Sequence, residues 1–554
     1  MFSRWWKSGY GRRLAGTLEA FAVLALASCA WAGPQTVMVP MRDGVKLATD
    51  IYLPSGTGPF PAVLVRTPYG KGMGAPLAAV ANTHGFALVV QDTRGRFASQ
   101  GANLPFEADG WLDGTADGYD TVEWVARQPW CTGKIGTWGG SALGITQLLM
   151  AGTNPPHLTC QVIIVGSPNF YADATYPGGV FKRALIEDWL KATRFEPQAL
   201  TTWVSHPTYD AYWKARDLGT RWSWVNVPAI HIGGWYDIFT QGTLDAFMGY
   251  QHKGGPGARG KQRLVMGPWT HGVGSRTAGA LTYPPNASAP PNHADDAWRW
   301  FDHYLSGKDN GADRIAPVVY YVMGDVTDPS APGNQWRTAP DWPVPSTATR
   351  YYFHQDRTLG SRPPAEKSAS LTYTYDPKDP TPGVGGPQLT IPAGPQKQNA
   401  IEARPDVLSF TSEALSAPLE VTGRVKAELW VRSDAPDTDF FVRLCDVYPD
   451  GTSYNVCEGQ IRARFRDGLD KEHLLVPGRT YRLNVDLWST SIIFNKGHRL
   501  RVDIASASVP GYDPNPNTGA PFRSSSESRS ARNTLIMERS HPSCVVLPVV
   551  SGYR

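Results

Sequence analysis

The sequence predicts an α/β chain in which a doubly wound, mainly parallel β-sheet carries a helical insertion and is followed by an all-β sandwich. Short apolar runs alternate with helical patterns up to about residue 346. Aromatic residues and helical patterns replace this alternation over residues 167–228. From residue 347 onward the apolar residues recur with a period of two, which is typical of half-buried antiparallel strands.

The composition agrees with a large folded protein. The 554 residues are 41% hydrophobic and 11% aromatic, and they include 56 Gly, 47 Pro and 20 Trp. A chain of this length divides into about two to four domains. Its apolar content excludes the disordered, collagenous and coiled-coil classes. The net charge is only +4 and there is no basic stripe, so we expect no nucleic-acid partner.

Residues 1–32 predict a signal peptide. Basic residues between positions 4 and 13 precede a short apolar stretch, and a small-x-small pattern (AWA) precedes Gly33. The apolar stretch is shorter than the ~20 residues of a membrane span, so we expect no transmembrane span. The segment LASC ends at Cys29 and resembles a lipobox, which leaves a lipid anchor at Cys29 open. We expect a secreted or periplasmic protein.

Residues 33–166 are predicted to form the first part of the α/β domain. Two antiparallel strands are expected within residues 36–52, and a helix at 119–127 carries apolar residues on one face. Continuous apolar runs predict strands that are buried on both faces. These runs lie at 62–66, 87–91, 135–138 and 162–166.

The remaining elements follow in the same way. The insertion, residues 167–228, has a helical pattern at 181–194 and is expected to form a cap. The α/β domain resumes at 229–346, with strands at 229–233 and 263–267. The sandwich is expected over 347–554, and its alternating runs lie at 425–431, 481–487 and 500–504. Loops rich in Pro and Gly are expected at 325–345 and 376–398.

Five cysteines follow the predicted signal peptide, so at least one thiol is free or intermolecular. Cys131 and Cys160 precede two runs that are expected to be neighbouring strands. Cys445 and Cys457 flank a predicted hairpin turn. Both pairs are candidates for disulfides in an oxidising compartment, and buried free thiols are an equally open alternative. No cysteine spacing matches a zinc site, and we expect no metal and no cofactor.

The segment GGSALG at residues 139–144 predicts a nucleophile elbow. It follows a short strand and opens a helix, which is the context that lifts the Ser141 hydroxyl above the edge of a sheet. The usual pattern ends in Gly two residues after the serine, whereas this chain has Leu143 there and Gly144 next. The isolated match is weak, because Gly and Ser are common, and the strand-turn-helix context strengthens it.

A serine nucleophile needs a base, and the base needs an orienting carboxylate. Asp237 and His271 each follow a predicted buried strand, in the chain order expected after the serine. Both are therefore expected at the carboxyl edge of the parallel sheet. The backbone N–H of Ala142 and the loop containing Tyr69 are candidates for stabilising the oxyanion, and a packing role for Tyr69 is the alternative.

Several ordered motifs make the chain resemble the CocE/NonD hydrolases, the family of cocaine esterase. The motifs are RTPY at 66–69, QDTRGRF at 91–97, the Ser141 elbow, GWYD at 234–237, GPWTH at 267–271, RWFDH at 299–303, SDAPDTDF at 433–440 and NPNTG at 515–519. X-Pro dipeptidyl peptidases and α-amino acid ester hydrolases are related to this family.

The resemblance implies an α/β-hydrolase fold with a helical cap and a C-terminal jelly roll that meet around the active site. It implies a catalytic triad of Ser141, Asp237 and His271, with the Tyr69 phenol in the oxyanion hole. It also implies that Asp92 and Arg94 form structural ion pairs rather than catalyse.

One departure concerns the substrate. The α-amino acid ester hydrolases carry acidic residues just after the catalytic aspartate, whereas this chain has Ile238, Phe239 and Thr240. Phe239 therefore suits an apolar acyl pocket, and a core role is its alternative. Two acids of the insertion, Glu187 and Asp188, are left open as ligands for an ammonium group.

Together these features predict an exported serine hydrolase that cleaves small-molecule carboxylic esters, and amides are left open as substrates. An X-Pro dipeptidyl peptidase, or an α-amino acid ester hydrolase or β-lactam acylase, is the alternative within the enzymes. A carbohydrate-binding module protein is the non-enzymatic alternative. A homo-oligomer is left open.

Overall fold

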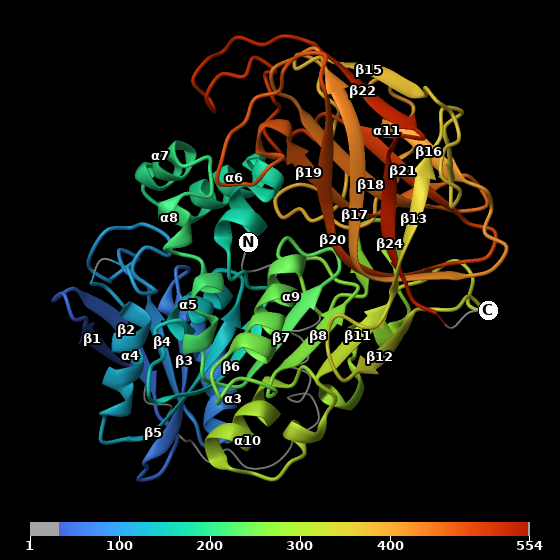
Figure 1. Ribbon diagram of the computed structural model, residues 1–554. Coiled ribbons are helices and arrows are strands. Elements are labelled where there is room, and N and C mark those ends of the chain that lie inside the picture. Colours follow the sequence, from blue (N-terminus) through green and yellow to red (C-terminus); the bar gives the residue numbers. More distant parts are fainter. Residues whose placement is uncertain (1–32, 113, 552–554) are drawn as a thin grey trace.

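The computed structural model describes residues 33–112 and 114–551. The predicted signal peptide and Cys29 lie outside these residues. Two large β-sheets dominate the structure, one in an α/β part and one in an all-β part (Figure 1). Within the described ranges, no helix is long and apolar enough to cross a membrane.

The first sheet has ten strands in the order β1-β2-β4-β3-β5-β6-β7-β8-β11-β12. The neighbours from β4 to β11 run parallel, whereas β1, β2 and β12 pair antiparallel at the two ends. The strands are β1 (Gln35–Pro40), β2 (Lys46–Tyr52), β3 (Phe60–Thr67), β4 (Ala87–Asp92), β5 (Cys131–Gly140), β6 (Leu158–Ile164), β7 (Ala229–Gly234), β8 (Arg263–Gly267), β11 (Val318–Val322) and β12 (Gln335–Ala339).

Helices cover both faces of this sheet. On one face, α3 (Gly74–Thr83) and α10 (Ala297–Ser306) pack against the side of β3 that carries Val63 and Val65. On the other face, α4 (Asp117–Ala126), α5 (Ala142–Ala151) and α9 (Thr240–Met248) pack near Leu64 of the same strand. Alternate side chains of one strand thus enter two apolar layers, which explains the continuous apolar runs.

The segment between β6 and β7 leaves the sheet and forms a small helical layer. It contains α6 (Arg183–Thr193), α7 (Pro197–Ser205) and α8 (Ala211–Lys214). Its aromatic side chains form one cluster over the start of α5. Figure 1 shows these helices beside the all-β part, above the α/β sheet.

The second sheet has twelve strands in a path that folds over a single apolar core. Inward residues alternate with outward ones, as in Val425, Ala427 and Leu429 of β17. The strands are β13 (Thr347–Phe353), β14 (Thr358–Gly360), β15 (Ser370–Tyr375), β16 (Leu408–Ser412), β17 (Leu419–Ser433), β18 (Asp439–Val447), β19 (Ser453–Arg462), β20 (Thr480–Phe494), β21 (Arg499–Ala505), β22 (Ala531–Glu538), β23 (His541–Pro542) and β24 (Cys544–Val549). One short helix, α11 (Asn399–Glu402), precedes β16.

The two parts are joined by hydrogen bonds and by a shared core. The backbone of Met323, just after β11, donates to the Ser491 carbonyl oxygen and accepts from the Ile493 N–H, both at 2.9 Å. Trp235 and Tyr236, just after β7, belong to the same apolar cluster as the sandwich core. The end of β7 is therefore held by residues from both parts.

One expectation about local structure is wrong. The Pro- and Gly-rich segment 325–345 was expected to be a loop, but it contains β12, which pairs with β11. Strand pairing at the edge of the sheet outweighs the loop-like composition here. A two-strand ladder of β9 (Thr277–Ala278) and β10 (Leu281–Thr282) also follows β8.

The candidate disulfides do not form, and all five described cysteines are free thiols. Cys457 lies opposite Leu444 rather than Cys445, because the β18–β19 register shifts between Leu444 and Cys445. The two thiols of this hairpin thus lie at different register positions. Cys131 lies before the point at which β5 begins to pair with β6, whereas Cys160 lies within that ladder, opposite Gly136.

Candidate active site

Ser141 lies in the sharp turn between β5 and α5. Its φ of 61° and ψ of −125° lie in a region that non-glycine residues rarely adopt, as in a nucleophile elbow. The turn is tightly packed, because a Cβ atom at Gly139 would lie 2.5 Å from the Leu143 Cβ. The absence of a side chain at residue 139 thus makes room for Leu143, where the usual pattern has Gly. Gly144 has its own constraint: a Cβ there would lie 3.0 Å from the Ile164 carbonyl oxygen.

The structure brings the three predicted triad residues into one hydrogen-bonded chain. His271 Nε2 is 2.8 Å from Ser141 Oγ, and His271 Nδ1 is 2.6 Å from Asp237 Oδ1. Asp237 is fully buried, and its second oxygen accepts the backbone N–H of Phe239 at 2.8 Å. The carboxylate is thereby fixed on both oxygens and orients the imidazole toward the serine.

The Tyr69 phenol lies between Ser141 and Trp189 of the helical insertion. It hydrogen-bonds to Ser141 and accepts the Trp189 indole N–H at 3.0 Å. Burial raises the pKa of Tyr69, and the two hydrogen bonds oppose that rise. The phenol therefore stays protonated at neutral pH and can donate. Ala142 is the first residue of α5, where a backbone N–H has no intrahelical acceptor, so a second donor lies next to Ser141.

A small, mostly apolar pocket of about 20 Å³ adjoins Ser141. Phe239 is 4% exposed and meets the His271 ring edge-on, with 5.7 Å between the ring centroids. Leu389 reaches the pocket from the loop between β15 and β16 of the all-β part. The residues around it are Phe106, Ser141, Ala142, Ile145, Phe170, Leu185, Ile186, Trp189, Ile238, Phe239 and Leu389. None of them is charged.

The two acids of the insertion that were left open as ammonium ligands do not line this pocket. Glu187 pairs with Arg523 of the all-β part at 2.7 Å, and Asp188 is exposed. The face of α6 that is turned inward carries Leu185, Ile186 and Trp189. The helical period thus points the acids away from Ser141.

The other residues marked by the sequence have structural contacts. Arg94 forms ion pairs with Asp43 at 2.7 Å and with Asp117 at 2.6 Å. Asp92 does not pair with Arg94; its Oδ1 accepts the backbone N–H of Lys71 at 2.6 Å, and burial raises the pKa of Asp92 to about 6. Neither residue belongs to the hydrogen-bonded chain at Ser141.

Sequence reasoning missed three residues near this site. Trp189 and Leu389 come from segments whose placement depends on tertiary packing. Lys182 is fully buried, and its Nζ has no hydrogen-bond partner within the described part of the chain. It lies over the Trp488 ring at 5.6 Å, and burial lowers the pKa of Lys182 to about 8. No local pattern distinguishes these residues from ordinary core and surface positions.

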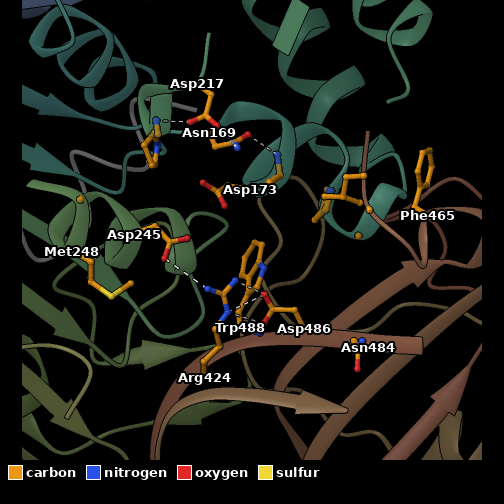
Figure 2. A pocket seen from close by; sticks show the side chains of 18 of the residues that line it. Asn169, Asp173, Asp217, Asp245, Met248, Arg424, Phe465, Asn484, Asp486 and Trp488 are labelled. Atoms are coloured by element: carbon orange, nitrogen blue, oxygen red, sulfur yellow. Dashed lines mark hydrogen bonds and ion pairs between the residues drawn. The ribbon is translucent and has the colours of Figure 1, made fainter. Parts of the chain in front are cut away.

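A larger cavity of about 650 Å³ lies where the helical insertion, α9 and the all-β part meet. Figure 2 shows Asp173, Asp245, Arg424 and Trp488 around this cavity. Arg424 is paired with Asp486 and lies 3.8 Å from Asp245. The cavity is not lined by Ser141, Asp237 or His271.

Comparisons with known proteins agree across nearly the whole chain. Residues 43–195 and 186–273 match the X-Pro dipeptidyl-peptidase (S15) family, and residues 310–546 match the X-Pro dipeptidyl-peptidase C-terminal non-catalytic domain. The chain is 34% identical to the cocaine esterase of Rhodococcus sp. (strain MB1 Bresler), over 93% of this chain and 98% of that protein.

Solved structures with a similar fold also cover nearly the whole chain. The structure of an aminopeptidase from a marine sediment archaeon, Thaumarchaeota archaeon, has a TM-score of 0.81 and 25% identity, covering 96% of this chain and 99% of that one. A Staphylococcus aureus hydrolase of the CocE/NonD family has a TM-score of 0.72 and 21% identity, covering 94% of this chain and 93% of that one. At this identity the second likeness concerns the fold alone.

Proposed function

Since this chain belongs to the CocE/NonD family of hydrolases, the family of cocaine esterase, we propose that it cleaves carboxylic esters through an acyl-enzyme on Ser141. The observation that carries the proposal is the hydrogen-bonded chain from Asp237 through His271 to Ser141, with separations of 2.6 and 2.8 Å. A nucleophile, a base and an orienting carboxylate in this order are what acyl transfer requires.

In the proposed acylation step, Ser141 Oγ attacks the ester carbonyl carbon while His271 Nε2 takes the hydroxyl proton. Asp237 stabilises the imidazolium that forms. The developing oxyanion accepts hydrogen bonds from the Tyr69 phenol and the Ala142 N–H. His271 then gives its proton to the leaving alcohol, and the acyl group remains on Ser141.

In the proposed deacylation step, water replaces the alcohol. His271 takes a proton from the water, whose oxygen attacks the acyl carbon and passes through the same oxyanion site. The serine leaves with its proton restored by His271. These steps use side chains of this chain and water, and none of them is routed through a metal or cofactor.

The pocket beside Ser141 supports an acyl group that is apolar and uncharged. Phe239 and Trp189 offer aromatic surface, and burying apolar surface contributes ~25 cal/mol per Å². An α-amino group would bring an ammonium into this lining, and an unpaired buried charge costs several kcal/mol. We therefore place esters ahead of N-terminal amino acid or dipeptide substrates, although an aminopeptidase has a similar structure.

We further propose that the α/β part is an α/β-hydrolase fold split into residues 33–166 and 229–346, with residues 167–228 as its cap. We propose a jelly roll for residues 347–554, supported by the order of the second sheet. Residues 1–32 remain proposed as an export signal, which would place the mature enzyme in the periplasm or outside the cell.

A fluorophosphonate probe tests the function directly, because it labels only an activated serine. We expect the wild-type chain to be labelled once, at Ser141, and to hydrolyse p-nitrophenyl esters. Ser141→Ala should abolish labelling and lower kcat by a factor on the order of 10⁴ or more, with an unchanged circular dichroism spectrum. An inert wild-type serine would contradict the proposal and favour a carbohydrate-binding protein.

A further inference from the structure

A second group of reactive side chains lies in the all-β part. Glu402 of α11, Cys445 of β18 and Asp503 of β21 each place one oxygen or sulfur atom so that the three atoms lie within 4.8 Å of one another. Cys445 is fully buried and Asp503 is 3% exposed. None of the three belongs to the hydrogen-bonded chain at Ser141.

Strand register explains why the group forms. In the antiparallel pair β18–β21, Cys445 lies opposite Arg501 and Arg443 lies opposite Asp503. These four side chains share one face of the sheet, since side chains alternate along a strand, and the intervening Leu444 and Val502 enter the apolar core. The polar face would be open to solvent, but α11 covers it and adds the Glu402 carboxylate.

Within residues 33–112 and 114–551, one carboxylate oxygen of this group finds no hydrogen-bond partner. The Glu402 side chain is only 6% exposed; its Oε2 pairs with Arg501, whereas its Oε1 is buried without a partner among the described residues. A buried oxygen of this kind costs about 1–3 kcal/mol unless something binds it. A cation bound at this oxygen would offset that cost.

The other two groups contact each other. The Cys445 thiol donates to Asp503 Oδ2 at 3.5 Å, and the Ser409 hydroxyl donates to Asp503 Oδ1 at 2.7 Å. An ion bound here would replace the thiol proton between Cys445 and Asp503. The nearest guanidinium on β18 is held elsewhere, because Arg443 donates to Glu458 at 3.0 Å and to Gln398 at 2.6 Å. Arg501 donates to Thr411 at 2.8 Å as well as to Glu402 Oε2.

We propose that Glu402, Cys445 and Asp503 bind a Zn²⁺ ion, with water as the fourth ligand. Zn–S bonds of ~2.3 Å and Zn–O bonds of ~2.0–2.2 Å in a tetrahedron need ligand atoms about 3.3–3.8 Å apart, so the group requires only a small contraction. A thiolate beside two carboxylates suits zinc better than magnesium or calcium, which prefer oxygen ligands alone.

Binding forms one Zn–S and two Zn–O bonds, and the Cys445 thiol releases its proton to solvent. The ion would fasten α11 to two strands of the sandwich and offset the buried carboxylates. We assign the ion a structural role, because none of its three protein ligands lines the pocket at Ser141. It is independent of the proposed esterase function.

Metal analysis of the purified full chain tests the site. After treatment with a chelator and dialysis against Zn²⁺ alone, we expect about one zinc per chain by mass spectrometry and a higher melting temperature than in the zinc-free protein. Co²⁺ in place of zinc should give a thiolate-to-cobalt charge-transfer absorption. Cys445→Ser should lose the absorption and the stoichiometric zinc.

Cys457→Ser is the matched control, because Cys457 is another buried thiol on the neighbouring strand β19. It should keep both the zinc and the absorption. Glu402→Gln, at the rim of the group, should weaken zinc binding about tenfold or more while the fold is kept. Zinc content equal to wild type in Cys445→Ser, or a wild-type chain that retains no zinc, would overturn the proposal.

Discussion

At the scale of single residues, the contact between Trp189 and Tyr69 connects α6 to the proposed chemistry. The indole N–H donates to the Tyr69 oxygen at 3.0 Å. Because that side of the oxygen is occupied, the phenol's own hydrogen is directed to the side facing Ser141. Trp189 is held firmly, since it stacks on Phe106 with 5.7 Å between ring centroids and 6° between the ring planes. It is thus a positioning residue for the proposed oxyanion donor.

A double-mutant cycle tests this coupling. Tyr69→Phe should lower kcat by ~10²–10³, because it removes one oxyanion donor. Trp189→Phe keeps an aromatic ring but removes the N–H, and a hydrogen bond contributes about 0.5–1.5 kcal/mol, so we expect a loss of about 2- to 10-fold in kcat. In the Tyr69→Phe background, Trp189→Phe should have no further effect on kcat. Additive losses would show that Trp189 acts by packing alone.

Asp173 gives a residue-scale prediction for stability. It is 5% exposed and accepts one hydrogen bond from Ser167, and burial, followed by the charge of Asp245, raises the pKa of Asp173 to about 8. The folded state therefore holds a proton that the unfolded state releases near pH 4. The stability from this proton is fully present below pH 4 and is lost as the pH rises to about 8.

An asparagine at position 173 cannot ionise, so the Asp173→Asn variant should not lose this stability as the pH rises. We expect the variant to exceed the wild type in unfolding free energy at pH 8 or above, by on the order of 1–3 kcal/mol, with a smaller difference at pH 5. Denaturant unfolding at both pH values measures it. Asp188→Asn, at an exposed position, is the control and should change neither value. If the difference in unfolding free energy between Asp173→Asn and the wild type became smaller as the pH rises, ionisation of Asp173 would not be its cause.

At the scale of elements, the orientation of α6 fixes the polarity of the proposed acyl pocket. Its inward face carries Leu185, Ile186 and Trp189, and its acids face Arg523 or solvent. We therefore expect kcat/KM for a phenylacetyl ester to exceed that for the phenylglycyl ester of the same alcohol by about tenfold or more at neutral pH. Steady-state kinetics with the two esters decides it. A preference for phenylglycyl would favour the aminopeptidase-like alternative.

The elements also show what local sequence can predict. The continuous apolar runs predict six of the parallel strands, from β3 to β8, within about four residues of their observed bounds, and 263–267 coincides with β8. The seventh, β11, is not among the predicted runs. The structure places Ser141, Asp237 and His271 together because each follows a strand of one parallel sheet. Trp189 and Leu389 could not be predicted, since their positions depend on how the cap and a distant loop pack. The candidate disulfide between Cys445 and Cys457 does not form, because the shift of register between β18 and β19 changes which side chains lie opposite each other.

At the scale of the whole molecule, the α/β and all-β parts share one apolar core. Trp235, Tyr236 and Met266 cluster with Leu429 and Val485 of the sandwich. Parts that share a core expose it together, so we expect heat to unfold the chain in one calorimetric transition. A fragment of residues 33–346 should lack cooperative unfolding and near-ultraviolet dichroism. Two separate transitions, or a natively folded fragment, would contradict a shared core.

The shared core has a consequence for the time at which activity first appears. Asp237 directly follows Trp235 and Tyr236, and the apolar cluster that contains these two residues also includes residues of β17, β20 and β21, which leave the ribosome much later. At about 5–20 residues per second, roughly 10–50 s separate the synthesis of Asp237 from that of β21. For most of that interval the nascent chain contains Ser141, Asp237 and His271 but lacks the sandwich residues that complete the apolar core beside Asp237. Unfinished chains should therefore be inert toward esters, and hydrolysis should begin only when synthesis is complete.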